Sequence, residues 1–238
     1  MKKNMSRRHF LKMGGLALAA MSVRPSLSFA AFRESETKFV SLRPSIDKRR
    51  FVSRAVEVII KEVKPKIKDE KLRWMFENCF PNTLDTTVRY KMKNDRPDTF
   101  IITGDIDAMW LRDSSAQVWP YLPLMKDDRD LQFLIAGLIN RLTECILIDP
   151  YANSFNDGPL GSNWETDHTQ HMVKELHERK WDIDSLCYPI RLAYQNWTLT
   201  KDTSIFSADW HEAMKLVVRT FKEQQRKQGI GTYSISRD

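Results

Sequence analysis

No stretch of this sequence after residue 30 approaches the run of about 20 apolar residues that a membrane-spanning helix requires. The 238 residues include only three cysteines, Cys79, Cys145 and Cys187, and these form no CxxC pair. No HExxH zinc motif occurs, and we find neither an internal repeat nor a low-complexity tract. These absences argue against an integral membrane protein, a disulfide framework, a zinc hydrolase of the HExxH type and a repeat architecture.

Cys145 is better explained by packing than by covalent pairing. Cys145 shares a helical stripe with Leu138 and Leu142, which favours a buried free thiol.

The first thirty residues have the composition of an export signal. Arg7 and Arg8, followed by Phe10-Leu11-Lys12, precede a weakly apolar stretch over 13–21 and a small-x-small cleavage signal at 28–30. Paired arginines are typical of twin-arginine signals, which send folded proteins across the bacterial inner membrane. We therefore expect a signal peptide over 1–30, a mature domain over 31–238, and a periplasmic or extracellular location. A basic disordered tail is the alternative.

The leader also changes how the net charge should be interpreted. Six positive charges and no acid lie in residues 1–30, so the formal net charge of +7 falls to about +1 over the remainder. A nucleic-acid partner therefore loses its main support. The basic residues over 61–71 are expected on the solvated face of a helical hairpin.

Most of the mature chain has helical spacing of its apolar residues. Helices are predicted over Ile46–Val63, over Asp69–Phe80, over Asp127–Ile148, from Asp184 or Ser185 through Trp197, and over Ser204–Lys227. Two regions differ: 86–103 has the pattern of a β-hairpin, and 149–167 is a long loop whose aromatic residues argue for order.

Paired helices, long connections and no βαβ rhythm predict an all-α fold, an α/α toroid with a small β-hairpin insertion. In such a barrel, the loops that enter the inner helices gather at one end and form a funnel. A simple helical bundle is the alternative, which the long loops make less attractive.

The segment GDIDAMWLRDSSAQ, residues 104–117, concentrates three aspartates, an arginine and a tryptophan directly after a predicted strand. Carboxylates that accept from sugar hydroxyls, a guanidinium that donates to another, and an indole stacked on a sugar face make a typical carbohydrate subsite. A purely structural role is also open, in which Asp113 caps a helix and Arg112 pairs with Asp105 or Asp107.

Histidines and acids over 165–171 raise the question of a metal. His168 and His171 are three residues apart, with Glu165 and Asp167 nearby, but the ligand set would be unusual. We expect no metal, and we expect His177 and His211 to be structural or at the surface. Acids near the start of the helix after 182, including Glu178 and Asp184, have a structural alternative, because the helix dipole favours negative charge at a helix N-terminus.

Three long blocks together resemble glycoside hydrolase family 125. They are TGDIDAMWLRDSSAQVWPYLPL at 103–124, DPYANSFN at 149–156 and ERKWDIDSLCYPIRLAYQNW at 178–197, and the similarity runs from about Ile46 to the end of the chain. The resemblance implies an exo-acting α-mannosidase with a preference for α-1,6 linkages. It also implies an inverting mechanism, no metal or other cofactor, and an (α/α)6 barrel.

The same resemblance suggests which residues bind a mannose-containing oligosaccharide. Residues of the three blocks, with a histidine from the loop between them, form the predicted substrate-binding set: Asp105, Trp110, Arg112, Asp113, Tyr151, Asn153, Asn156, His168 and Asp184.

The catalytic pair is not predicted within the sequence. Inversion needs two carboxyl groups about 6.5–9.5 Å apart, one as acid and one as base, and the resemblance implies an aspartate and a glutamate that we expect beyond Asp238. Family members are longer, so we expect the 238-residue chain to be an incomplete toroid, inactive and poorly stable by itself. A mannoside-binding fragment and a different (α/α)6 carbohydrate-active enzyme are the alternatives.

Overall fold

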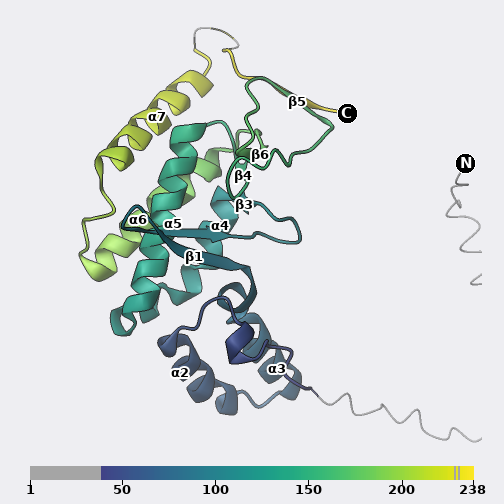
Figure 1. Cartoon of the computed structure of the whole chain (residues 1–238), viewed down its shortest axis with the longest axis vertical. Helices are drawn as coiled ribbons and strands as arrows, with labels where there is room; N and C mark the ends of the chain where they lie inside the picture. Colours follow the sequence, from purple (N-terminus) through teal and green to yellow (C-terminus); the bar gives the residue numbers. More distant parts are fainter. Residues whose placement is uncertain (1–38, 228, 230) are drawn as a thin grey trace, which may run out of the picture. The chain divides into compact units, whose positions relative to one another are not determined.

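Helices account for most of the regular structure in the described part of the chain, residues 39–227, 229 and 231–238, as given by a computed structural model (Figure 1). The predicted signal peptide lies outside the described residues. The α-helices are α2 (Arg54–Val63), α3 (Glu70–Cys79), α4 (Leu111–Gln117), α5 (Arg129–Ile148), α6 (Ile183–Thr200) and α7 (Ala208–Gln224). Shorter helical turns are η1 (Ile46–Lys48), η2 (Lys64–Lys66), η3 (Thr83–Thr87) and η4 (Trp119–Asp127).

Helix α5 is the centre of the hydrophobic core, as its wide apolar stripe predicts. Asp128 caps it by accepting a hydrogen bond from the Leu131 backbone N–H at 3.0 Å. The helix packs against α6, α7 and the β-hairpin, and Cys145 is buried on it as a free thiol, as predicted. Contrary to the expectation that no segment after residue 30 approaches a membrane span, α5 is the one helix among the described residues that is long and apolar enough to cross a membrane. Two thirds of its apolar window is buried within the protein, so it is a core helix.

The predicted hairpin is confirmed as the antiparallel pair β1 (Val88–Lys93) and β2 (Arg96–Ile101). The two turn residues, Asn94 and Asp95, have φ of 51° and 58°, which is the geometry of a tight turn that matches strand twist. Strand β2 packs against α5, which the hairpin crosses in Figure 1. The two elements are joined by a buried ion pair in which Arg141 donates to Asp98 at 2.5 and 2.7 Å.

The predicted helix over Ile46–Val63 is wrong in its first half. Residues 46–48 form one 3₁₀ turn, and α2 begins at Arg54, where the Ser53 hydroxyl accepts from the Val56 N–H at 3.2 Å. The Arg50 and Phe51 N–H groups donate to the carbonyls of Asp85 and Leu84. These long-range bonds hold the segment extended, and helical periodicity alone does not reveal them.

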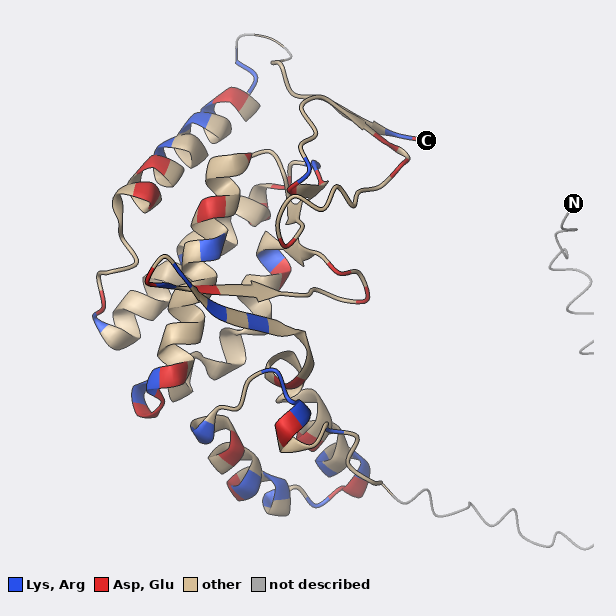
Figure 2. Cartoon of the chain, viewed as in Figure 1, with Lys and Arg blue, Asp and Glu red and all other residues tan. Residues whose placement is uncertain are grey.

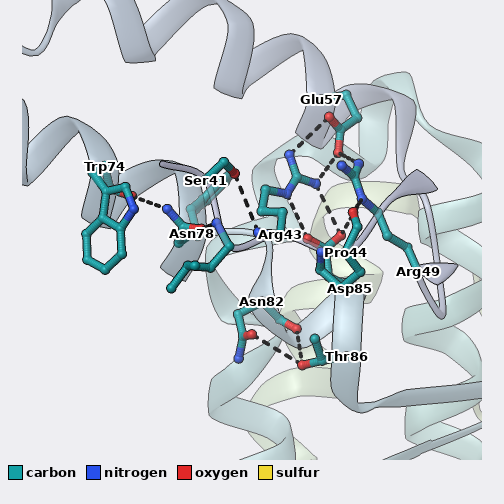
Figure 3. A network of polar contacts seen from close by, with 12 residues as sticks. Ser41, Arg43, Pro44, Arg49, Glu57, Trp74, Asn78, Asn82, Asp85 and Thr86 are labelled. Carbon is teal, nitrogen blue, oxygen red and sulfur yellow. Dashed lines mark hydrogen bonds and ion pairs between the residues drawn. The ribbon is translucent and has the colours of Figure 1, made fainter. Parts of the chain in front are cut away.

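A network of charges fastens the segment before α2 to the rest of the fold (Figure 3). Arg43 donates to Asp85 at 2.7 Å and to Glu57 at 2.5 Å, and Arg49 donates to Glu57 at 3.0 Å. The side chains of Arg43 and Asp85 are 7% and 3% exposed. Burial opposes the charge on Arg43, but hydrogen bonds to both acids raise its pKa. The network therefore has the character of a structural clamp.

The other helix predictions are correct in existence and shifted at their ends. Helix α3 begins at Glu70, one residue later than predicted, with Asp69 as its N-cap. Helix α6 begins at Ile183 with Asp182 at its N-cap position, and not with a cap at Asp184 or Ser185, because the Ser185 N–H already donates to the Asp182 carbonyl. Helix α7 begins after the Ser207 cap. The basic residues over 61–71 are mostly exposed, and Figure 2 shows charges of both signs along α2 and α3.

Short strands organise the long connections that the sequence marked as ordered. β3 (Met109–Trp110), β4 (Ser154–Phe155) and β6 (Leu176–Glu178) form one antiparallel sheet in that order, and β5 (Asp167–Thr169) pairs with β7 (Ile235–Arg237). The first sheet brings all three blocks of the family-like sequence together, because Trp110 pairs with Ser154 and Ser154 pairs with Glu178. The fold is thus mostly helical with small sheets.

Candidate functional site

The candidate site is built where β3 passes into α4. Gly104 has φ of +77°, which lets the chain turn sharply after the hairpin. The loop is closed by the Thr103 N–H, which donates to the Ala108 carbonyl, and by the Thr103 hydroxyl, which accepts from the Trp110 N–H, both at 3.0 Å. Met109 and Leu111 are buried, and the alternate side chains of Trp110 and Arg112 are only partly covered. This alternation presents the polar face outward.

A single continuous segment lines a hollow of about 560 Å³, which we call the β3–α4 hollow. Four of the nine predicted substrate-binding residues, Asp105, Trp110, Arg112 and Asp113, lie on it. The other residues that line it are Thr103, Gly104, Ile106, Ala116 and Gln117. The hollow thus combines carboxylates, a guanidinium, an amide and an indole.

Arg112 is held between two aspartates. Its Nη2 donates to Asp113 Oδ2 at 3.0 Å, and its Nη1 donates to Asp184 Oδ2, on α6, at 3.2 Å. Partial burial opposes the charge, but the hydrogen bond to Asp184 and the charges of both acids raise the pKa of Arg112. The three side chains are 38–41% exposed, so the guanidinium stays accessible to a ligand.

The structural alternative for this segment is wrong in its details. Asp113 is the third residue of α4, and Trp110 occupies the N-cap position, so Asp113 does not cap the helix. Asp107 pairs with Arg89 at 2.7 Å and not with Arg112. Asp105 lines the hollow, and among the described residues it is not a partner of Arg112.

Two acceptor atoms at the site are left open. Gln117 Oε1 and Asp184 Oδ1 are buried, and neither accepts a hydrogen bond from the described residues. Buried acceptors normally have a donor, because an unmade hydrogen bond costs about 1–3 kcal/mol. Both atoms are therefore unsatisfied acceptors beneath the surface of the site.

Trp110 is oriented by a second group of residues. Its indole Nε1–H donates to Glu178 Oε2 at 3.3 Å, and Asn153 Nδ2–H donates to the same oxygen at 2.5 Å. Asn153 also donates to Asp182 at 3.2 Å. His177 lies edge-on to Trp110, with ring centroids 5.4 Å apart, and its Nδ1–H donates to the Ser162 carbonyl at 3.1 Å. His177 is buried, which confirms the structural role expected for it.

The nine predicted residues do not all gather at one place. Asp184 contacts Arg112, and Asn153 contacts Glu178, so both join the site through another side chain. Asn156 is buried and donates to the carbonyls of Ser162, Lys174 and Leu176, so its amide holds a loop.

The two remaining residues, Tyr151 and His168, have partners elsewhere. The Tyr151 hydroxyl donates to Glu223 on α7, and its ring stacks on Tyr233 at 4.8 Å. His168 contacts Asp238 at 2.8 Å and is exposed. Neither lines the hollow within the described part of the chain.

Glu178 is the functional candidate that the sequence did not single out. Its position before a helix favoured a role with the helix dipole, whereas in the structure it is the last residue of β6 and its carboxylate is buried. The available signal was its place in the block ERKWDID, next to the predicted site residue Asp184.

No group of three or more histidine, cysteine, aspartate or glutamate side chains that could hold a metal ion occurs among the described residues. The histidines and acids over 165–171 are instead engaged separately: Asp167 binds Arg237 at 2.5 Å, and His168 binds Asp238.

Comparison with known proteins connects this geometry to carbohydrate chemistry. Residues 69–237 match the family model described as metal-independent alpha-mannosidase, GH125. The meiotically up-regulated gene 157 protein of Schizosaccharomyces pombe is 40% identical over 190 residues, which cover 76% of this chain and 37% of the yeast protein.

A solved structure gives the same result. It is a metal-independent α-mannosidase of Streptococcus pneumoniae in a non-productive substrate complex with α-1,6-mannobiose, and it is 41% identical with a TM-score of 0.71. The match covers 79% of this chain and 44% of that chain. The chain thus spans less than half the length of either relative.

Proposed function

We propose that this chain, which belongs to glycoside hydrolase family 125, the metal-independent α-mannosidases, takes part in releasing terminal α-linked mannose. The preferred linkage in this proposal is α-1,6. The observation that carries the proposal is the β3–α4 hollow, where Arg112, fixed by two aspartates, lies beside the indole of Trp110. An aromatic face and a fixed fork of donors are the groups that recognise a sugar ring and its hydroxyls.

Each residue at the hollow has a proposed role. The ring of Trp110 stacks on the apolar face of the terminal mannose, and Arg112 donates to its hydroxyl oxygens. Asp105, which lines the hollow, accepts from a hydroxyl group, and Asp184 helps to hold Arg112. Asp113 orients Arg112, because its Oδ2 accepts from the guanidinium.

The finer features follow the family and are part of the same proposal. We assign an inverting reaction without a metal, in which one carboxyl group protonates the leaving oxygen and another activates water. None of the carboxyl groups described at the hollow is assigned either role. An (α/α)6 toroid, export through the twin-arginine pathway and a mannose-containing oligosaccharide as substrate complete the proposal.

A second function, mannoside binding without cleavage, has one observation in its favour. Asp113 and Asp184 both accept from Arg112, so these two carboxylates are engaged by a group assigned to binding. The chain's coverage of only 44% of the solved relative is consistent with either function.

One experiment separates the two. The purified chain is titrated with α-1,6-mannobiose by calorimetry, with maltose as a matched disaccharide, and the same samples are assayed for released mannose. Binding with release supports the hydrolase, and binding without release supports the second function. No binding of mannobiose, with the chain folded by circular dichroism, rejects both.

A further inference from the structure

The carboxylate of Glu178 collects hydrogen bonds from three separate segments. Its Oε2 accepts from Trp110 Nε1–H at 3.3 Å and from Asn153 Nδ2–H at 2.5 Å, and its Oε1 accepts from Arg237 Nη2–H at 2.5 Å. The side chain is 8% exposed. An ionised carboxylate only accepts hydrogen bonds, so it satisfies all three donors at once.

Arg237 connects this carboxylate to the last strand of the chain. Its guanidinium donates to Asp167 at 2.5 and 3.0 Å and to Glu178 at 2.5 Å, and so joins two buried acids. The strand partner of β7 is β5, which contains Asp167. The orientation of Glu178 is therefore linked to the pairing of β5 and β7.

The backbone alone does not fix the indole of Trp110. Strand β4 lies between β3 and β6, so the ladder sets the positions of the Trp110 and Glu178 backbones. The side-chain torsions of a partly exposed tryptophan remain free to change unless a contact selects one orientation. The bond to Glu178 and the edge contact with His177 supply that selection.

We propose that Glu178 is a positioning residue that sets the orientation of Trp110 in the β3–α4 hollow, and that Arg237 holds Glu178 in the orientation this requires. The consequence for mannoside binding rests on the proposed function, but the effect on Trp110 does not. Glu178 acts on a sugar only through the indole and through Asn153.

Glutamine is the sharpest replacement for Glu178 because it keeps the shape and removes one acceptor. Its amide has a single oxygen and an NH₂ group that only donates. If the oxygen faces Trp110 and Asn153, the NH₂ group faces the donor of Arg237. If the amide is reversed, the NH₂ group faces the indole and Asn153. Either orientation sets donors against each other and breaks the arrangement.

The indole N–H signals of the ¹⁵N-labelled full chain test the positioning without any ligand. Trp110→Phe identifies the signal of Trp110 among the seven tryptophans. We expect Glu178→Gln and Arg237→Gln each to shift that signal, and Arg219→Gln, at an exposed arginine of α7, to leave it in place. An unmoved Trp110 signal in Glu178→Gln overturns the proposal. If Glu178→Gln does not fold, Arg237→Gln decides, because its side chain is 46% exposed.

Titration with α-1,6-mannobiose then tests the consequence. Glu178→Gln loses the charge-assisted hydrogen bond that orients the indole of Trp110, so its affinity for mannobiose should fall about tenfold or more. Arg219→Gln should bind mannobiose with the affinity of the unmodified chain. If the unmodified chain does not bind, the proposed function fails and the indole signals still decide the positioning. If it binds and a folded Glu178→Gln binds equally well, the positioning role is rejected.

Discussion

Arg112 and Asp184 are 72 residues apart in the chain, and their side chains meet with Nη1 and Oδ2 separated by 3.2 Å. One lies on α4 and the other on α6, two helices that pack directly against each other. The contact unites two sequence blocks that both resemble glycoside hydrolase family 125. One oxygen of Asp184 is thus paired with Arg112, and the other, Oδ1, is buried without a hydrogen-bond donor among the described residues.

Arg112→Lys should weaken mannoside binding by roughly tenfold or more, with little change in stability. An ammonium group is a point charge and cannot replace the planar fork that contacts both aspartates. Ion pairs that are more than a third exposed contribute only about 0–1 kcal/mol to folding. Calorimetric titration with α-1,6-mannobiose measures the first effect, and thermal unfolding measures the second. Arg219→Lys on α7 is the control, and equal affinity in both variants would contradict the assigned role.

Local pattern was sufficient for the elements whose residues contact their own neighbours in sequence. The stripe of leucines and isoleucines predicts α5, and the turn between two β-rich runs predicts the β1–β2 hairpin, because both depend on periods of a few residues. The start of α2 could not be predicted in this way. Phe51 donates its N–H to the carbonyl of Leu84, far along the chain, and this bond prevents the helix from extending backwards.

The candidate site shows the same division. Trp110, Arg112 and Asp113 are adjacent in sequence, so their clustering was visible before any fold was known. The role of Glu178 was not visible in the sequence, because its three hydrogen-bond donors come from distant segments. They lie on β3, on the loop that precedes β4, and on β7. The family resemblance places Tyr151 in the predicted substrate-binding set, but its partners are Tyr233 and Glu223, which no local pattern connects with it.

Removal of Asp98 from the Arg141–Asp98 pair should destabilise the protein by about 3 kcal/mol, the lower end of the cost of breaking a buried pair, because Asp157, at 3.3 Å, is then the acid that remains beside the buried guanidinium. The two side chains are 9% and 5% exposed. Asp98→Asn should show this loss as a lower midpoint of urea denaturation. The matched control is Glu144→Gln, whose partner Lys93 lies on the same hairpin and whose pair is 43–46% exposed. We expect a change below about 1 kcal/mol there. Similar losses in both variants would show that burial does not decide the energy.

Gly137→Ala should destabilise the packing of α5 on β2. A Cβ at this position would lie 2.5 Å from Thr99 Oγ1 and 3.0 Å from the Asp98 backbone nitrogen, so the strand or the helix has to shift. Overpacking of this kind typically costs about 1–3 kcal/mol, more than the helix propensity gained by alanine. Urea denaturation measures the difference.

The control for Gly137→Ala uses coupling between neighbours. Thr99→Ala removes the closest atom, together with a hydrogen bond to the Leu134 carbonyl. The double variant should therefore lose less stability than the sum of the two single variants. Strict additivity would place the strain somewhere other than at Thr99.

Replacement of Arg7 and Arg8 by lysine should abolish export of the precursor, because the twin-arginine pathway reads the paired arginines and not their charge alone. The precursor is expressed in a bacterium that has the pathway, and the periplasmic and cytoplasmic fractions are compared by immunoblot. Replacement of Lys2 and Lys3 by arginine is the charge-matched control and should leave export unchanged. A periplasmic double-lysine variant would reject this route.

The protein should become less stable as the pH falls through the acid range, because Asp128 loses its charge. Burial alone would raise its pKa, but hydrogen bonds from Ser53 and from the backbone N–H groups of Leu131 and Ala55 lower it below its usual value. A carboxyl group whose pKa is lower in the folded state stabilises that state above its unfolded pKa of about 3.9, and the contribution is lost below it.

Asp128→Asn should therefore be about 1–2 kcal/mol less stable at pH 7, from loss of the charge-assisted hydrogen bonds. That difference should shrink towards pH 2–3, whereas the exposed Asp130→Asn should show no comparable trend. Urea denaturation at pH 7, 5 and 3 measures it, and a difference that stays constant with pH would mean that the charge of Asp128 does not hold α2 and α5 together.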